Sequence, residues 1–177
     1  MKEGGVGGAN TLTGLDFEQE VDFQNLLAAK PGYEVKPIPG KAGKGVYFKG
    51  ELVARCFRKH DFYNYLEEED VDWEPKISKQ LLPDDALLVI VRETLFIIEV
   101  KYQQVAGSVD EKLQTCDFKR KQYQKLVAGL GLRVEYVYVL NDWFRQPCYK
   151  DVLDYIHSVN CQYKFGSLPL AWLGLPE

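Results

Sequence analysis

The stretch DDALLVIVRETLFIIEVKYQ, at residues 84–103, brings Asp84, Glu99 and Lys101 onto segments built mainly from Leu, Val, Ile and Phe. A carboxylate or an ammonium on a core strand costs free energy unless it is paired or bound to a metal ion. Asp84 and Glu99 offer oxygen ligands of the kind that Mg²⁺ takes, and Lys101 offers an adjacent ammonium. The simpler interpretation is a Glu99–Lys101 ion pair on a half-exposed strand, with Asp84 capping a turn after Pro83.

The alternation of side chains along a strand determines which of these groups can meet. A two-residue turn at 93–94 predicts a hairpin in which Asp84 shares a face with Glu99 and Lys101. Asp85 then points to the other face. Two carboxylates and a lysine are therefore expected to converge at the open end of the hairpin. The predicted pairs are Arg92 with Leu95, Leu88 with Glu99, and Ala86 with Lys101.

The composition is that of an ordinary soluble protein, with 46% hydrophobic and 27% charged residues among 177 and a net charge of −4. No apolar run approaches the roughly 20 residues that span a bilayer, and the N-terminus lacks the basic start and apolar segment of a secretory signal. The four cysteines lack CxxC spacing and interleaved histidines, which argues against a zinc site and predicts free thiols. We therefore expect a cytoplasmic protein without a membrane segment.

Charge is unevenly distributed along the chain. Residues 61–75 carry seven acidic and no basic side chains, whereas residues 111–125 carry five basic and two acidic ones. Such segregation permits a local basic surface on an acidic protein. A solvated helix face explains either run equally well.

The elements that position these groups follow from periodicity and from turn residues. Residues 1–12 read as a flexible tail, and residues 13–177 as a single domain. Setting aside a short helix at 61–70, the order is helix, three strands, helix, strand, helix, strand, which predicts an α/β or α+β fold around one mixed sheet. The expected segments are a helix at 15–32, extended chain at 33–40 and 44–57, strands at 85–92 and 95–102, a helix from 108, a strand at 133–140, a helix at 149–159 and a strand at 161–165.

The stretch from Pro83 to Lys101 resembles the motif of the PD-(D/E)XK nucleases, with Pro83-Asp84, an apolar hairpin and then Glu99-Val100-Lys101. TGLDFEQEV resembles the acidic first-helix element of many members, and EVKYQQVAGSVDEKLQTCDFKRKQYQKL resembles type II restriction endonucleases. The resemblance extends from about residue 13 to residue 140. It implies a restriction-endonuclease-like α/β core, a central mixed β-sheet flanked by helices in the order αβββαβ. The doubled Asp84-Asp85 departs from the pattern, and strand parity favours Asp84 as the ligand.

The resemblance also implies a role for each motif residue. Asp84, Glu99 and the carbonyl of Val100 would hold Mg²⁺ against the scissile phosphate, where the metal stabilises growing negative charge and lowers the pKa of a bound water. Lys101 would orient or deprotonate that water, or offset charge in the transition state. This set of roles is that of a metal-dependent phosphodiesterase.

Two more residues are expected at this site. Glu18 would help to hold a second metal through water, although an exposed helix carboxylate is the simpler interpretation. Gln103 lies on the predicted Glu99 face and would steady the attacking water or a phosphate, although a sheet-edge amide explains it as well.

Contacts to a nucleic acid are expected from a helix start and from two basic groups. Ser108 begins SVDE, in which Glu111 completes a capping box, and the free N–H groups of that helix start could meet a phosphate. A polar stripe along the same helix requires it to run unbroken through Asp117, which could instead cap a second segment. The candidate DNA contacts are Ser108, Lys112, Lys119, Lys121, Arg55 and Arg58.

These observations predict a Mg²⁺-dependent endonuclease that hydrolyses phosphodiester bonds in double-stranded DNA, of the type II restriction kind. A repair or recombination nuclease of the same fold and a non-catalytic nucleic-acid-binding module are the alternatives. Because one site cuts one strand and the chain has little room for a separate recognition domain, we expect a homodimer or a partner subunit that supplies recognition.

Overall fold

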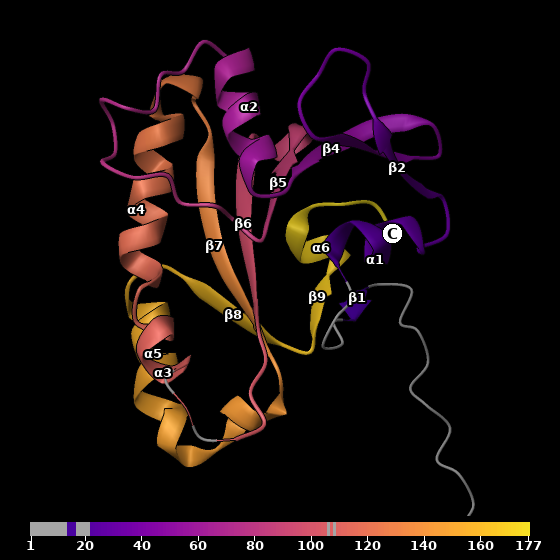
Figure 1. The fold of residues 1–177 in the computed structure, drawn as a ribbon. Coiled ribbons are helices and arrows are strands. Elements are labelled where there is room, and N and C mark those ends of the chain that lie inside the picture. The colour runs from indigo at the N-terminus through magenta and orange to yellow at the C-terminus, as the bar shows by residue number, and fades with distance from the viewer. Residues whose placement is uncertain (1–13, 17–21, 106, 108) are drawn as a thin grey trace, which may run out of the picture.

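The computed structural model describes residues 14–16, 22–105, 107 and 109–177. Figure 1 shows the arrangement of its elements. The strands are β1 (Gly14–Asp16), β2 (Tyr33–Pro37), β3 (Lys44–Phe48), β4 (Glu51–Phe57), β5 (Asp85–Val89), β6 (Thr94–Lys101), β7 (Arg133–Leu140), β8 (Gln162–Phe165) and β9 (Ser167–Pro169). The helices are α1 (Phe23–Ala28), α2 (His60–Glu68), α3 (Val109–Leu113), α4 (Cys116–Val127), α5 (Lys150–Ser158) and α6 (Leu170–Leu173). Within the described ranges, no helix has the length and apolar character that crossing a membrane requires.

Seven strands form one mixed sheet in the order β2-β3-β4-β5-β6-β7-β8, and β1 pairs separately with β9. The strands from β2 to β6 are antiparallel, whereas β6, β7 and β8 are parallel to one another. Parallel neighbours need a crossover connection, and the segments with α4 and α5 provide it. The predicted α/β fold with a mixed sheet flanked by helices is confirmed, and the sheet is wider than the four strands of the αβββαβ order.

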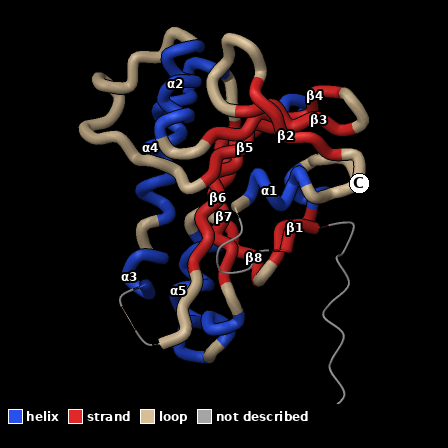
Figure 2. Tube along the Cα trace, turned by 45° about the vertical axis from the view of Figure 1, so that its right-hand side comes forward, coloured by secondary structure: helices blue, strands red, loops and turns tan. Residues whose placement is uncertain are grey.

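Helices cover both faces of this sheet. Figures 1 and 2 show α4 and α5 on one side and α1 on the other. Along β6, Leu95 and Ile97 pack in the core that contains Leu126 of α4, whereas Phe96 and Ile98 pack in the core that contains Leu27 of α1. Odd-numbered residues of β6 therefore face α4, and Glu99 and Lys101 continue this row.

The β5–β6 hairpin has a longer turn and a different register from those predicted. A 3₁₀ turn at Ile90–Arg92 and the left-handed Glu93 (φ 48°) connect the strands, and Leu88 pairs with Leu95 instead of with Glu99. The predicted register was thus wrong by four residues. Because a shift of four is even, every side chain keeps its predicted face, and Asp84 stays on the side of Glu99.

Two predicted helices also differ from the structure. Of the helix expected at 15–32, residues 14–16 form β1, which pairs with β9, and α1 begins only after Asp22, whose side chain accepts a hydrogen bond from the Asn25 N–H. The helix expected from residue 108 ends at Leu113, and α4 starts at Cys116. The polar stripe predicted along one unbroken helix is therefore divided between two segments.

Candidate active site

The charged end of the hairpin lies where β6 continues past β5. Asp85, the first residue of β5, pairs with Ile98, and Glu99 to Lys101 extend further along β7. The Nζ of Lys101 lies 3.1 Å from Oε2 of Glu99 and 3.8 Å from Oδ2 of Asp84. The structure thus brings the three motif side chains together, with the ammonium between the two carboxylates.

Glu99 is the buried member of this group, with 5% of its surface exposed. Nζ of Lys119 on α4 lies 2.8 Å from Oε1 and 3.1 Å from Oε2, and the Tyr136 hydroxyl from β7 donates to Oε1. Burial by itself raises the pKa of Glu99, but the ammonium groups of Lys101 and Lys119 and the hydrogen bonds outweigh it and hold the pKa below its usual value. Glu99 is therefore an ionised carboxylate inside the fold at neutral pH.

Asp84 is the solvent-exposed member of the group, with 52% of its side chain exposed. The segment before it is held by hydrogen bonds to its main chain. The carbonyl of Leu81 accepts from the hydroxyls of Tyr63 on α2 and Tyr123 on α4, and the carbonyl of Pro83 accepts from the Lys59 N–H. Two helices on the same face thus set the position from which Asp84 approaches Glu99.

The donors at this end of the sheet fit a hard divalent cation. Asp84 and Glu99 already converge on one positive charge, the ammonium of Lys101. The carbonyl of Lys101 accepts from the Asn141 N–H beside β7, so the carbonyl of Val100 points to the opposite edge, past the end of β5. Within the described ranges, no three His, Cys, Asp or Glu side chains form a metal-binding group. Two carboxylates, a carbonyl and water are the ligand set of a Mg²⁺ that stays partly hydrated.

Asp85 points to the opposite face of the sheet, toward α1. It is 4% exposed, and its Oδ1 lies 3.6 Å from Nε of Arg58, whose Nη1 also donates to Oδ2 of Asp22 at 3.1 Å. Burial raises the pKa of Asp85 to about 7, with Arg58 opposing and the Asp22 and Asp84 carboxylates reinforcing the rise. The two neighbouring aspartates therefore have different surroundings, and Asp84 alone faces Glu99.

Gln103 lies just beyond β6 and is 7% exposed. Its side-chain N–H donates to the carbonyl of Val105, and its main chain exchanges two hydrogen bonds with the Asn141 side chain. Among the residues that the structure describes, the buried side-chain oxygen has no hydrogen-bond partner. This placement ties the ends of β6 and β7 together next to the site.

The predicted DNA contacts are found in different surroundings. Lys119 lies inside the site and binds Glu99, whereas Lys121 is 62% exposed and pairs with Asp117. Lys112 is exposed near the end of α3. Arg58 is 43% exposed and lies on the opposite face. Glu18 and Ser108 lie outside the described residues.

Arg55 lies inside the fold and not on a DNA-accessible surface. It is 9% exposed, both terminal nitrogens bind the Glu68 carboxylate at 2.9 Å, and one also donates to the carbonyl of Ala42. A phosphate or a base edge would have to displace this buried pair. The structure therefore assigns Arg55 to the connection between β4 and α2, and we do not retain it as a DNA contact.

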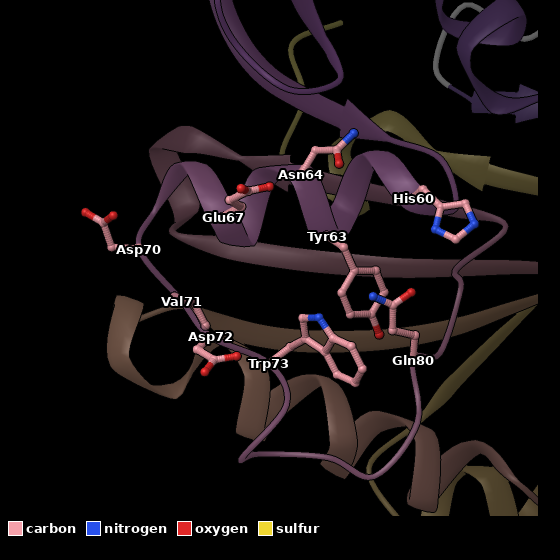
Figure 3. Close-up of a pocket in the computed structure, with 9 residues that line it drawn as sticks. All are labelled: His60, Tyr63, Asn64, Glu67, Asp70, Val71, Asp72, Trp73 and Gln80. Carbon is pink, nitrogen blue, oxygen red and sulfur yellow. The ribbon is translucent and has the colours of Figure 1, made fainter.

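A groove of about 520 Å³ lies beside the segment that leads to Asp84, but its lining is unsuited to a phosphate. Figure 3 shows Tyr63 on α2 and Trp73 on the following loop turned toward the groove, with Glu67 and Asp72 at one end of it. Negative charge on this lining repels a nucleic-acid backbone.

Two members of the site were not recognised from the sequence. Lys119 was assigned to the DNA, and Tyr136 was seen only as part of an alternating strand. The alternation of residues 133–140 places Tyr136 on one face of β7, and this alternation is the only sequence signal that points to its role. Its contact with Glu99 requires the parallel pairing of β6 with β7, which sequence periodicity does not supply.

A family model described as a PD-(D/E)XK nuclease superfamily domain matches residues 47–160, from within β3 to just after α5. No curated protein and no solved structure matches the chain. The matched region includes the whole hairpin, α4 and β7, and with them Lys101, Lys119 and Tyr136, which contact Glu99. Because the match covers well over half of the chain, this protein belongs to the PD-(D/E)XK nuclease superfamily.

Proposed function

We propose that this protein is a Mg²⁺-dependent endonuclease that cuts double-stranded DNA, of the type II restriction kind, built as a single nuclease domain over residues 13–177. The observation that carries the proposal is the buried, ionised Glu99, which faces Asp84 across the ammonium of Lys101. A chain that needed only stability would gain little from this arrangement, because buried ion pairs seldom stabilise a fold more than apolar packing does. The arrangement fits the charge of a metal ion and a phosphate.

The roles of the residues follow from their positions. A divalent cation bound by Asp84, Glu99 and the Val100 carbonyl would offset negative charge on the phosphate and acidify a bound water. Lys101, with 22% of its side chain exposed, can turn its ammonium from the carboxylates toward the attacking water and hold that water for in-line attack. Tyr136 and Lys119 fix the orientation of the Glu99 carboxylate, so that it is ready before the substrate binds.

Binding of the duplex is proposed to involve the exposed lysines on the α4 side. Lys121, and Lys112 at the end of α3, carry charge that backbone phosphates would neutralise. One site cuts one strand, so we infer a homodimer or a partner subunit for cleavage of both strands. The four cysteines are free in the structure, which supports the proposed cytoplasmic location.

Incubation with supercoiled plasmid tests the proposal. The protein should convert the plasmid to discrete linear fragments with Mg²⁺ and leave it intact with EDTA. Glu99→Gln should abolish cleavage while the circular dichroism spectrum stays native-like. The control is Glu67→Gln, which replaces an exposed carboxylate on α2 and should cut normally. Mapping of the ends separates the alternatives: cuts at DNA junctions or flaps would favour a repair or recombination nuclease. Binding without any cutting would favour a non-catalytic module and contradict the enzyme.

A further inference from the structure

A second charged pocket lies at the other end of β6, on the other face of the sheet. Its volume is about 440 Å³, and its lining includes Arg92, Thr94, Arg133 and Trp172. Thr94 is the first residue of β6 and Lys101 is the last. At roughly 3.3 Å per residue, the two sites are therefore about 23 Å apart along the strand. Thr94 also belongs to the row of β6 side chains opposite to Glu99. The pocket is therefore separate from the catalytic site.

Within the described ranges, the side chains of the two arginines of this pocket donate to main-chain carbonyls. Nη1 of Arg92 donates to the main-chain carbonyl of Trp172 at 2.8 Å, and Nη2 of Arg133 donates to the carbonyl of Arg92 at 3.3 Å. Arg92 also packs closely on Gly174, where an added Cβ would come within 2.1 Å of its Cδ. These contacts fix both side chains without cancelling their charges.

A third cation lies next to them. Nζ of Lys164 on β8 lies 5.3 Å from the centroid of the Trp172 ring. In the part of the chain that the structure describes, none of Arg92, Arg133 and Lys164 has a carboxylate within ion-pair distance. Glu135 is the single carboxylate in the described lining of the pocket. Two arginines line the pocket against one carboxylate, and Lys164 adds a third positive charge beside the Trp172 ring. On a protein with a net charge of −4, this local excess of positive charge favours a bound anion.

The rest of the lining indicates what kind of anion fits. The Trp172 indole and the Gln162 amide stand beside the guanidinium groups, so the pocket offers an aromatic surface and a hydrogen-bonding side chain as well as charge. Guanidinium groups match the oxygens of a phosphate in planar, two-pronged contacts. A volume of about 440 Å³ suits one small molecule and is too small for a duplex.

We propose that the pocket between Arg92, Arg133 and Trp172 binds the terminal phosphate of a single nucleotide, either a free nucleotide or the phosphorylated end of a nucleic-acid strand. The phosphate lies against the two guanidinium groups, and the base lies toward Trp172 and Gln162. The proposal goes beyond the nuclease reaction and is tested by binding alone.

The test is a titration of tryptophan fluorescence with adenosine monophosphate in EDTA, where no cleavage occurs. Adenosine monophosphate should quench the wild-type signal, adenosine should bind far more weakly, and Trp172→Phe should remove the response. Arg133→Gln should weaken binding about tenfold, as expected for the loss of a charge-assisted contact. Glu135→Gln should tighten it. Arg92 is a poorer choice for substitution, because it also holds the Trp172 carbonyl.

Two controls and one competition complete the design. Arg145→Gln removes an exposed arginine that pairs with Asp142, and it should leave binding unchanged. Lys101→Gln should also bind normally; loss of binding there would place the nucleotide in the catalytic site and overturn the proposal, as would equal affinity in Arg133→Gln and Arg145→Gln. Displacement of the nucleotide by a 5′-phosphorylated oligonucleotide, but not by its 5′-hydroxyl form, identifies a strand end. Displacement by neither identifies a free nucleotide, and equal displacement by both would show a general polyanion surface and contradict the proposal.

Discussion

At the scale of single residues, the neighbouring aspartates Asp84 and Asp85 provide a matched comparison. Asp84→Asn removes a carboxylate that faces Glu99 and should lower the single-turnover cleavage rate by about 10²–10³-fold, the size expected when a group that stabilises transition-state charge is lost. Asp85→Asn changes a carboxylate on the opposite face and should cut within a few-fold of the wild type. Single-turnover rates at saturating Mg²⁺ measure both. The reverse ranking would show that Asp85 is the ligand.

Lys119 provides a second prediction at this scale. Because its ammonium helps to hold the pKa of Glu99 low, Lys119→Gln should raise that pKa and move the acid limb of the cleavage pH profile to higher pH. Lys119→Arg keeps the charge and should restore the profile in part. Lys121→Gln, which lies on the same helix and pairs with Asp117, should weaken DNA binding without moving the profile. A weakened affinity with an unmoved profile in Lys119→Gln would show that Lys119 acts only as a phosphate contact.

At the scale of elements, the approach of Asp84 depends on α2, and α2 is joined to β4 by a buried ion pair. The pKa of Glu68 is lowered to about 2, mainly by the hydrogen bond from Arg55. The Ala42 N–H and the Lys41 ammonium also bind this carboxylate and lower its pKa, whereas burial raises it. A carboxylate whose pKa is lowered by folding stabilises the fold above its unfolded pKa of about 4.5 and loses that effect as the pH falls toward 2.

Glu68→Gln should therefore destabilise the protein at pH 7 by about 1–2 kcal/mol, once solvent screening of the partly exposed group is allowed for. The difference from the wild type should shrink as the pH falls from about 4.5 toward 2. Urea unfolding at several pH values measures it, with Glu67→Gln on the same helix as the control. A difference that does not change with pH would mean that Glu68 acts by packing and not by its charge.

At the scale of the whole molecule, the proposed metal site lies on β5 and β6 and is joined through Lys119 to α4 and through Tyr136 to β7. A ligand that binds only the folded state stabilises the whole cooperative unit. At a Mg²⁺ concentration ten times the Kd, the gain is about 1.4 kcal/mol, which should raise Tm by about 3–6 °C in a domain of this size.

Thermal unfolding with and without Mg²⁺ measures this effect, and the metal-induced change in Tm is compared within each variant. Glu99→Gln should lose most of the Mg²⁺-induced rise in Tm. Glu135→Gln, which replaces a carboxylate of the distant pocket, should keep it. An equal shift in all three proteins would place the metal elsewhere, and the ligand assignment of Asp84 and Glu99 would fail.

Local patterns in the sequence were sufficient for much of this protein. The strand at 133–140 has the predicted bounds, the mixed sheet flanked by helices is confirmed, and Asp84, Glu99 and Lys101 lie on one face as predicted. These features depend on periodicity within a few residues. Even the wrong hairpin register preserved the face of each side chain, because parity repeats every two residues.

Tertiary structure alone decided the surroundings of those groups. The buried pair of Lys119 with Glu99 spans 20 residues, and the contact with Tyr136 spans 37. The ion pair of Arg55 could not be predicted for the same reason, since only the packing of α2 on β4 brings Glu68 to it. Side-chain type and strand parity are local properties, whereas burial, ion pairing and the resulting pKa depend on which distant segments the fold brings together.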